Sequence, residues 1–507
     1  MIISPLIQCV LVVALASRAI AQVGTIPWTP KSDRILRQVE ITVPPKYVAI
    51  ALDKALHFVR VPDGWTASVF AAGSALNKPR FMSWGPKSTL FVANMNGNNI
   101  LALPDENRDG VADTVIVAAR GFSLGHDVRF WRDTMFVCQE AGVIKLWRSD
   151  TSSHVYDQRL TVIDKGSQAN QTGGNHRTRT LVIDTIRMKL YVSVGSRGNA
   201  DRESDRAVLE EYNYDGSGRR VFASGTRNAV GMTLHPRTGR LWANNNGSDN
   251  QGNNLPPEWV DIIREGGFYG YPVGYHFRNW FPLTGDYQDL KPFTKQDSAN
   301  MERMQPPAAL VDAHCAPMGL VFTEDGVRSE YANGAFMAMR GSWNRTPPSG
   351  AKIVFLRFDN DADTIANEVE DFCTGFIRDT SNVATRWARP VGLAVDNSGC
   401  VYVSIDDGKQ CVLRLTPPTP SHVHDVQQTG TFVRPNPARD VVAIDVQPSE
   451  PCQVVVVDAQ GKVWADESVS FGKTRLHVDS STWPNGSYIV VMRSSSGLRT
   501  QNVTIYR

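Results

Sequence analysis

A histidine flanked by glycines, His176, is the residue whose type and setting most directly suggest chemistry. It lies in the segment GGNHRTRT that begins at Gly173, before expected strands at residues 180–184 and 189–194. Glycines at the start of a strand let a ligand approach the backbone, and an imidazole with a pKa near 6.5 accepts a proton at neutral pH. The segment predicts either a general base at a ligand site or a histidine satisfied by a neighbouring carbonyl.

An acidic turn at residues 105–113 is the second chemical signal. Asp105, Asn107, Asp109 and Asp113 occupy positions 1, 3, 5 and 9 of a D-x-N-x-D-G loop, and Gly110 supplies its sharp turn. Position 12 is Ile116, so the bidentate glutamate of such loops is missing. The spacing predicts a structural calcium ion, with a plain acidic turn as the alternative.

The strands that would position His176 and the acidic turn follow a repeated pattern of the type x-L-[YFW]-V. Six copies follow short turns, near residues 90, 135, 190, 241, 335 and 401. A single sheet of this kind cannot bury its own faces, so repeats stacked around an axis indicate a β-propeller. We predict an all-β fold with six four-stranded blades, against the alternative of a β-sandwich array. A propeller would place a ligand site at one mouth of its channel, on the loops that enter the inner strands.

The composition sets the wider limits. A chain of 507 residues is too long for one ordinary domain, and a net charge of +2 with no Lys/Arg run gives no signal for nucleic acid or a membrane surface. The apolar run at residues 6–16 and the A-x-A site ending at Ala21 predict a signal peptide at 1–21, cleaved before Gln22. No later stretch approaches membrane-span length. The mature protein is therefore expected outside the cytoplasm.

The remaining boundaries follow from proline and strand patterns. Residues 22–59 form an N-terminal extension, irregular and proline-punctuated as far as 45, and 60–416 form the propeller. The Pro-rich stretch 417–430 is expected to be a linker, and 431–507, with five alternating strands, a small β-sandwich. Six cysteines remain after the signal peptide, and Cys400 and Cys411, which flank a predicted hairpin, are the first candidate for a disulfide.

Nine ordered segments of the propeller region carry a resemblance. They are GGNHRTRT from Gly173, LYVSVGS from Leu190, FASGTRNAVG from Phe222, LWANNNG from Leu241, LPPE from Leu255, EGGFYGYP from Glu265, AHCAPMGL from Ala313, GSWNRTPP from Gly341 and RPVGLAV from Arg389. Residues from about 60 to 416 resemble the soluble PQQ-dependent sugar dehydrogenases, most closely the L-sorbosone dehydrogenase-like group. The tail segments RPNPA from Arg434, DAQG from Asp458 and NGSY from Asn485 resemble the C-terminal sorting domain of type IX secretion substrates.

The first resemblance implies a specific chemistry. PQQ is an anionic tricarboxylate quinone that accepts a hydride and needs cationic partners, a polarising metal and a base for the substrate hydroxyl. His176 matches the family's general base. Arg227 matches a residue that stabilises negative charge on the quinone oxygen; without the resemblance it could equally form a surface ion pair. The implied cofactor contacts are His126, Asn175, Ser196, Asp201, Arg227, Asn228, Asn246, Tyr269, His314, Arg340 and Arg389.

The resemblance also implies a calcium ion on the cofactor. Gly247 and Ser248 match backbone carbonyl donors to that ion, and carbonyl donation does not depend on the side chain, although the glucose enzymes carry proline where this chain has Ser248. Asn175 falls where those enzymes carry an acid beside the base.

Two classes of function follow. The first is a PQQ-dependent oxidoreductase that acts on a sugar or a sugar-derived aldehyde or alcohol and passes electrons to a cytochrome or quinone. The second is a non-redox propeller at the cell surface, either a carbohydrate-binding module or a metal-dependent lactonase. In both cases the tail would engage the secretion machinery and deliver the protein, through the periplasm, to the cell surface or the medium.

Overall fold

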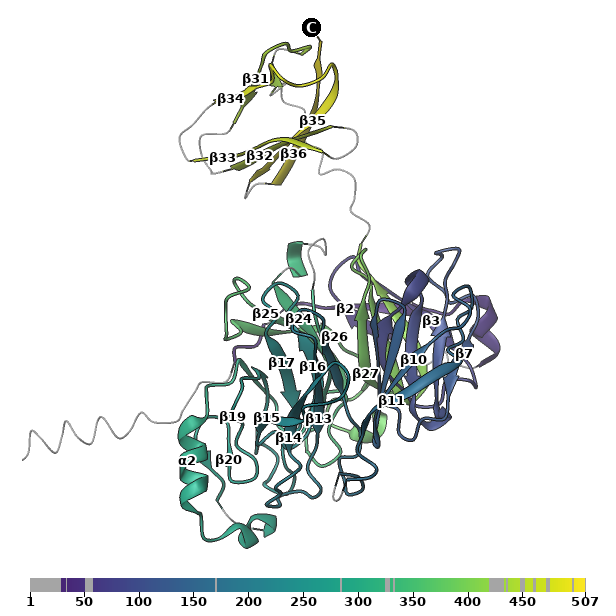
Figure 1. Cartoon of the computed structure of the whole chain (residues 1–507), viewed down its shortest axis with the longest axis vertical. Helices are drawn as coiled ribbons and strands as arrows, with labels where there is room; N and C mark the ends of the chain where they lie inside the picture. The colour runs from purple at the N-terminus through teal and green to yellow at the C-terminus, as the bar shows by residue number, and fades with distance from the viewer. Residues whose placement is uncertain are drawn as a thin grey trace, which may run out of the picture. The chain divides into compact units, whose positions relative to one another are not determined.

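The computed structural model describes residues 29–506, except for 33, 51–57, 169–170, 283–284, 324–328, 332, 419–432, 435, 447–451, 459–461, 471–474 and 495–496. The chain divides into two compact units, Met1–Pro418 and Thr419–Arg507. Figure 1 draws the first in purple to green and the second mainly in yellow. Among the helices of the described segments, none has the length and apolar character that a membrane crossing requires. The signal peptide at 1–21 and the linker at 417–430 fall almost wholly outside the described residues.

The first unit is a propeller of six four-stranded antiparallel blades. The blades are, in order, β4 (Pro79–Trp84), β5 (Leu90–Asn94), β6 (Asn99–Leu103) and β7 (Ile116–Arg120); β8 (Asp127–Trp131), β9 (Thr134–Gln139), β10 (Gly142–Trp147) and β11 (Gln158–Asp164); β12 (Leu181–Asp184), β13 (Lys189–Val194), β14 (Val208–Asn213) and β15 (Arg220–Ser224); β16 (Ala229–Leu234), β17 (Leu241–Asn245), β18 (Glu258–Ile262) and β22 (Ala309–Val311); β23 (Pro317–Phe322), β24 (Gly334–Met339), β25 (Lys352–Arg357) and β26 (Glu368–Cys373); and β27 (Ala388–Val395), β28 (Val401–Gly408), β29 (Cys411–Thr416) and β3 (Thr66–Ala72). The predicted six-bladed fold is confirmed.

Every copy of the repeated strand pattern is the second strand of a blade. These strands are β5, β9, β13, β17, β24 and β28, and their apolar residues are buried on both faces. One face packs on each neighbouring blade, so the usual alternation of buried and exposed residues is lost. Trp242 of the fourth blade, for example, packs edge-to-face on Phe322 and Phe358 of the fifth. The blades therefore supply each other's cores.

The N-terminal segment closes the ring. β3 pairs antiparallel with β29 and completes the sixth blade, and no strand among the described residues of the tail pairs with a propeller strand. Two further strands, β1 (Arg37–Thr42) and β2 (Phe58–Val61), extend this sheet outward. The expectation of irregular structure up to residue 45 is therefore wrong for β1, because Ile41 and Thr42 bond alongside β3 and gain the partners that an isolated segment lacks.

An insertion between β18 and β22 carries the only α-helix in the described part of the chain. It contains β19 (Gly267–Phe268), β20 (Gly274–Tyr275), β21 (Asn279–Trp280), a 3-10 turn and the helix α2 (Lys295–Arg303). α2 begins with a capping box between Thr294 and Asp297. β19 pairs with the end of β15, and Tyr269 and Tyr271, which follow β19, line a small slot together with Arg227.

The second unit consists of two sheets around a common core of buried residues that includes Val442, Val456 and Val490. The sheets are β30 (Val433–Arg434), β31 (Val441–Asp445) and β34 (Arg475–Asp479), and β33 (Val463–Val469), β32 (Cys452–Asp458), β35 (Gly486–Ser494) and β36 (Gly497–Ile505). All five strands expected from the sequence are present, whereas the two-residue β30 and the longer β33 were not predicted. In β33, charged residues, including Asp466 and Glu467, interrupt the alternation.

The candidate disulfide is wrong. None of the six described cysteines forms a disulfide bond, and all six are buried. Cys411 pairs with Ile405 beside the turn of the β28–β29 hairpin, whereas Cys400 precedes Val401 at the open end. Strand residues rise about 3.3 Å each, so the two Cα atoms lie too far apart for a bridge.

Candidate functional site

The residues predicted to act on the substrate or to contact the cofactor gather at one end of the propeller, where the inner strands begin. These strands, β4, β8, β12, β16, β23 and β27, contact one another in ring order. His126 directly precedes β8, Asn228 directly precedes β16, and His176 and His314 lie within five residues of β12 and β23. Residues from distant parts of the sequence therefore share one channel mouth.

His176 is a neutral imidazole with one ring nitrogen left for a ligand. Its Nδ1 lies 3.0 Å from the carbonyl oxygen of Ser196 and 2.9 Å from that residue's Oγ. The carbonyl can only accept, and the Oγ hydrogen is donated to Gly198, so Nδ1 must carry the proton. Burial, reinforced by the positive charge of Arg227, lowers the pKa of His176 to about 3. Nε2 is therefore an unprotonated base at neutral pH.

The backbone around His176 is held on several sides. Arg179 and Arg206 each donate to the His176 carbonyl, at 2.8 and 2.9 Å. A Cβ on Gly195 would lie 2.6 Å from the His176 Cβ and 2.8 Å from Oδ1 of Asn228. Glycine at 195 is therefore what lets β13 end between these two residues. Arg179 and Arg206 were not predicted, because buried arginines that bind only carbonyls have no local sequence signature.

Arg227 is buried beside His176 and its guanidinium is fully engaged. It donates to the Asn199 carbonyl and Oδ1 at 3.1 and 2.9 Å, and to the Gly247 carbonyl at 2.5 Å. It also pairs with Asp249 at 3.1 Å. The Ser196 amide donates to the Arg227 carbonyl at 2.6 Å, which links this residue to the partner of His176. The alternative of a surface ion pair is excluded by this burial.

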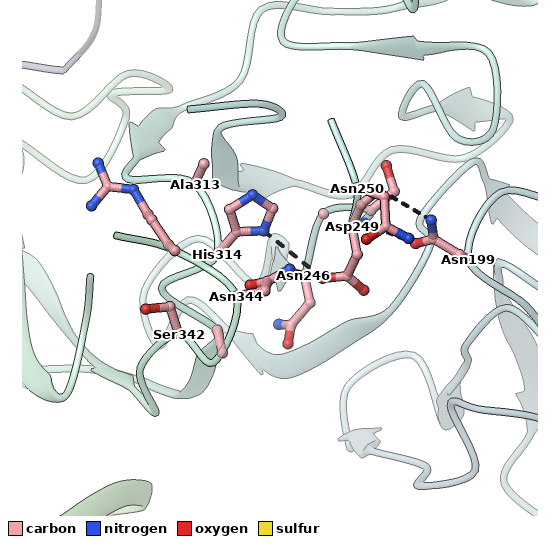
Figure 2. Close-up of polar contacts among 12 residues, drawn as sticks. Asn199, Asn246, Asp249, Asn250, Ala313, His314, Ser342 and Asn344 are labelled. Atoms are coloured by element: carbon pink, nitrogen blue, oxygen red, sulfur yellow. Dashed lines mark hydrogen bonds and ion pairs between the residues drawn. The ribbon is translucent and has the colours of Figure 1, made fainter. Parts of the chain in front are cut away.

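Asp249 is a centre of the site that sequence reasoning missed. Besides Arg227, it accepts from Nδ2 of Asn344 at 2.7 Å and lies 3.9 Å from Nδ1 of His314 (Figure 2). Its amide donates to Asn199 at 2.8 Å. These partners come from four separate loops, so no spacing within one segment could have identified them. His314 itself donates from Nε2 to the Gly252 carbonyl, 3.0 Å away, and holds a left-handed backbone with φ of 63°.

A cluster of cations lies at the starts of β4 and β27. It comprises Lys78, Arg80, Arg340, Arg386 and Arg389, which face the two carboxylates of Asp406 and Asp407. We call these seven residues the arginine cluster. Burial, together with the nearby charges of Arg340 and Arg386, lowers the pKa of Arg389 to about 9. Five cations against two carboxylates leave an excess of three positive charges, a setting that favours an anionic ligand.

Individual contacts in the cluster leave part of its charge uncompensated. Arg80 bonds Asp406, and Arg340 reaches the same carboxylate at 3.0 Å. Arg389 donates to the carbonyls of Arg340 and Gly341 at 3.1 and 2.5 Å, and its Nη1 lies 3.8 Å from Asp407. Arg340 and Arg389 were predicted. Lys78 and Arg80 were not, although both flank the start of an inner strand, as Arg389 does.

His126 completes this side of the mouth. Its Nδ1 accepts from Nε of Arg80 at 3.1 Å, so the proton is on Nε2, which is buried without a hydrogen-bond partner among the described residues. Burial, with the charge of Arg80 adding to it, holds the pKa of His126 well below its usual value. A buried donor of this kind is available to an acceptor in the channel.

The remaining predicted cofactor contacts differ in their setting. Asn246 donates to the Pro317 carbonyl at 2.7 Å, and the hydroxyl of Tyr269 donates to Ile262 while it accepts from Arg264. The Tyr269 hydroxyl therefore bonds only backbone groups in these contacts. Its ring stacks on Trp259 and lines a small slot beside Arg227. Asn175 and Asp201 are exposed.

The predicted cofactor calcium donors lie next to Arg227. The Gly247 carbonyl already faces a cation, the Arg227 guanidinium, and the amide of Gly247 donates to the buried Glu258 at 3.2 Å. Glu258 also accepts from the amide of Ala316 at 2.7 Å, and burial raises its pKa to about 8. Glu258, which was not predicted to matter, thus ties the Gly247 loop to the His314 loop. Ser248 bonds Tyr287 through its hydroxyl, which leaves its carbonyl available.

The acidic turn lies at the opposite end of the blades, after β6. Its carboxylates bond its own amides: Asp105 accepts from Asp109 and Gly110, and Asp113 from Glu106. Within the described residues, no group of three or more His, Cys, Asp and Glu side chains converges as around a metal ion. A calcium ion at Asp105, Asn107, Asp109 and Asp113 stays a prediction, and the turn lies far from the mouth.

Comparisons with known proteins follow the same division of the chain. The family described as TrAA12-like matches residues 59–414, and the secretion system C-terminal sorting domain matches residues 433–506. The sorting domain indicates a secreted or cell-surface protein.

Among curated relatives, a pyrroloquinoline quinone-dependent pyranose dehydrogenase of Coprinopsis cinerea is 25% identical over 412 residues. That match covers 69% of this chain and 53% of the relative, so the chain spans about half the length of that protein. A pyrroloquinoline quinone-dependent sugar dehydrogenase of Hypocrea jecorina is 22% identical over 403 residues, which cover 68% of this chain and 86% of the relative.

Among solved structures, the holo form of the PQQ domain of the Coprinopsis cinerea pyranose dehydrogenase aligns with a TM-score of 0.58 and 23% identity. The alignment covers 71% of this chain and 97% of that domain. At this identity the similarity establishes the shared fold.

Proposed function

Because the chain belongs to the TrAA12-like family, we propose that it is a PQQ-dependent oxidoreductase that oxidises a sugar or a sugar-derived aldehyde or alcohol. The observation that carries the proposal is one channel mouth that combines a neutral imidazole, whose Nε2 can accept a proton, with an excess of partly buried positive charge. The relatives named for PQQ-dependent sugar oxidation support it.

The arginine cluster would hold the cofactor. An excess of three positive charges matches a ligand with three carboxylates, and Arg340 and Arg389 can each bind a carboxylate through two N–H groups. The buried Nε2–H of His126 would donate to another oxygen of the same ligand. Calcium would be held by the carbonyls of Gly247 and Ser248: the Gly247 oxygen has a second lone pair besides the one that accepts from Arg227, and Ser248 bonds Tyr287 through its hydroxyl rather than its carbonyl. The residues present therefore fit both groups.

The chain's own chemistry is a proton transfer. PQQ, when bound, would supply the carbon that accepts the hydride. Nε2 of His176 would take the proton of the substrate hydroxyl, while Ser196 holds Nδ1–H and thereby fixes the tautomer. Arg227 would stabilise negative charge that develops beside the base. Burial, with the charge of Arg227 adding to it, keeps Nε2 of His176 unprotonated at neutral pH by lowering the pKa of this residue.

A finer assignment completes the proposal. The substrate would be sorbosone-like or aldose-like, and a cytochrome or quinone outside the cell would take the electrons. The C-terminal unit would direct export through the secretion machinery and take no part in catalysis, because every candidate site residue lies in the first unit.

Reconstitution tests the proposal. The full-length protein, freed of bound cofactor by dialysis against a chelator, should gain dye-linked activity with aldoses only when both PQQ and calcium are restored. Activity that needs calcium but not PQQ, with a lactone as substrate, would instead support the metal lactonase. Sugar binding without turnover in any combination would support the binding module.

A further inference from the structure

Trp343 is the most exposed tryptophan among the residues that the structure describes. Its side chain and backbone together are 69% exposed, against 40% for Trp147 and 36% for Trp280, the next most exposed among the described tryptophans. Exposing an indole sacrifices a large apolar area. A single exposed aromatic is common at surfaces, but Trp343 lies on a loop whose neighbouring residues are bonded to the candidate site.

The residues on either side of Trp343 are anchored. The Ser342 amide donates to Ser349 at 2.9 Å, and its carbonyl accepts from Nη1 of Arg386 at 2.7 Å. Asn344 donates to Asp249 at 2.7 Å, and Arg345 donates to the Asn253 carbonyl at 2.8 Å. Trp343 therefore projects into solvent from an ordered loop, so little conformational entropy would be lost when a ligand contacts it.

The same anchors place Trp343 at the candidate site. Arg386 belongs to the arginine cluster, and Asp249 binds Arg227. Figure 2 shows Ser342 and Asn344 on the loop that passes His314 and Asp249. The segment 342–344 thus runs from the cluster proposed to hold the cofactor to the network around Arg227, and Trp343 is its midpoint.

We propose that the indole of Trp343 is the platform on which the apolar face of a pyranose ring stacks while the substrate hydroxyl faces His176. This inference rests on the proposed function and specifies its substrate class as a ring-closed sugar. A pyranose presents C–H groups on one face, which pack on an aromatic ring, whereas an open-chain polyol has no rigid apolar face. The side chains around the mouth include the polar groups of His176, Arg227 and Asp249. Trp343 supplies an exposed apolar surface of the kind that sugar sites need beside such hydrogen-bonding groups.

Kinetics give the first test. Trp343→Ala should raise the KM for a pyranose about tenfold and leave kcat within about twofold, because stacking away from the reacting atoms binds substrate and transition state alike. Trp343→Phe keeps a smaller aromatic ring, so its KM for the pyranose should lie between the KM of Trp343→Ala and that of the parent. Trp147→Ala is the matched control, since Trp147 ends β10 at the opposite end of the second blade and its loss should leave KM unchanged.

Chemical protection gives a test that does not depend on turnover. N-bromosuccinimide should oxidise Trp343 first in the PQQ- and calcium-loaded full chain, as read by peptide mass spectrometry. D-glucose at ten times its KM, with no electron acceptor present, should slow that oxidation about tenfold. Sorbitol at the same concentration should not, while the oxidation rate of Trp147 should stay constant throughout.

The outcomes separate this inference from the proposed function. A parent that turns over sugars, combined with a Trp343→Ala variant of unchanged KM and an unprotected Trp343, would refute the stacking role alone. A variant that changes only the KM for the electron acceptor would also refute it and would place the acceptor on this loop. A parent that neither binds PQQ nor oxidises any sugar would refute the proposed function, and this inference would fall with it.

Discussion

Replacement of the base is the perturbation that the site geometry defines most closely. His176 presents an unprotonated Nε2 because Ser196 occupies Nδ1 and because its pKa is lowered to about 3. Nearly all molecules are therefore competent at neutral pH, and His176→Ala removes the whole contribution of the base. General-base catalysis contributes about 10² to 10⁴ in rate, or about 2.7 to 5.4 kcal/mol of barrier. We expect the rate of PQQ reduction to fall by that factor and PQQ affinity to stay nearly constant.

Stopped-flow absorbance of the loaded protein, mixed with a pyranose and no electron acceptor, measures this rate directly. His235→Ala is the matched control: His235 is also a buried histidine, but it follows β16 at the far end of its strand and pairs with Asp361. A His176→Ala variant that reduces PQQ at the parent rate would refute the assignment, and His126 and His314 would become the candidates.

The pH dependence supplies a second check on the same residue. Protonation removes the base, so the rate must fall as the pH falls, and an ordinary histidine would lose half its rate near pH 6.5. Burial and Arg227 lower the pKa of His176, whereas the carboxylates of a bound cofactor would offset part of the effect of Arg227. We therefore expect the midpoint between about pH 3 and 6.5. A midpoint at or above pH 6.5 would contradict the neutral, buried imidazole.

Four further predictions follow from other parts of the molecule. Arg389→Ala should weaken PQQ binding by about 1.5 to 3 kcal/mol, the cost of losing a hydrogen bond to a charged oxygen, and Arg227→Ala, which removes a buried cation beside the site, should also weaken it; calorimetric titration measures both. Asp109→Ala should lower the melting temperature in calcium buffer more than it lowers turnover, and equal melting temperatures with and without chelator would count against a bound ion. Glu258 keeps a proton in the fold up to about pH 8 that the unfolded chain releases near pH 4.5. Stability should therefore decline as the pH rises through this window, and Glu258→Gln should flatten that slope in thermal unfolding between pH 5 and 8.5. A chain ending at Thr416 should fold and bind PQQ but lose surface delivery, and loss of PQQ affinity in a folded truncation would overturn this division of labour.

Much of the fold could be predicted from the sequence because its strongest pattern is local. Each x-L-[YFW]-V copy is buried on both faces as the second strand of a blade, so six copies indicate six blades. Closure by β3 could not be predicted, because the pairing of β3 with β29 joins residues more than 300 positions apart. The prediction of a Cys400–Cys411 disulfide was wrong for a related reason. The two residues are close in sequence, but they lie at opposite ends of a hairpin.

Some residues of the candidate site could likewise be predicted from the sequence, and others could not. His176, Arg227 and Arg389 lie in segments with a recognisable pattern at the starts of inner strands, and the structure brings them to one mouth. The partners that complete the mouth, such as Asp249 and Arg80, bond side chains from other loops. Their roles arise from contacts that exist only in the assembled ring, so no single segment carries their signal.

A spectroscopic titration tests the central claim most directly. PQQ is added to the full-length protein in calcium buffer until its absorbance shows saturation, and a pyranose is then added without an electron acceptor. We predict saturation at one PQQ per chain, followed by loss of the oxidised cofactor's absorbance, with both effects removed by a chelator. A titration without saturation, or a bound spectrum that no sugar changes, would contradict the account.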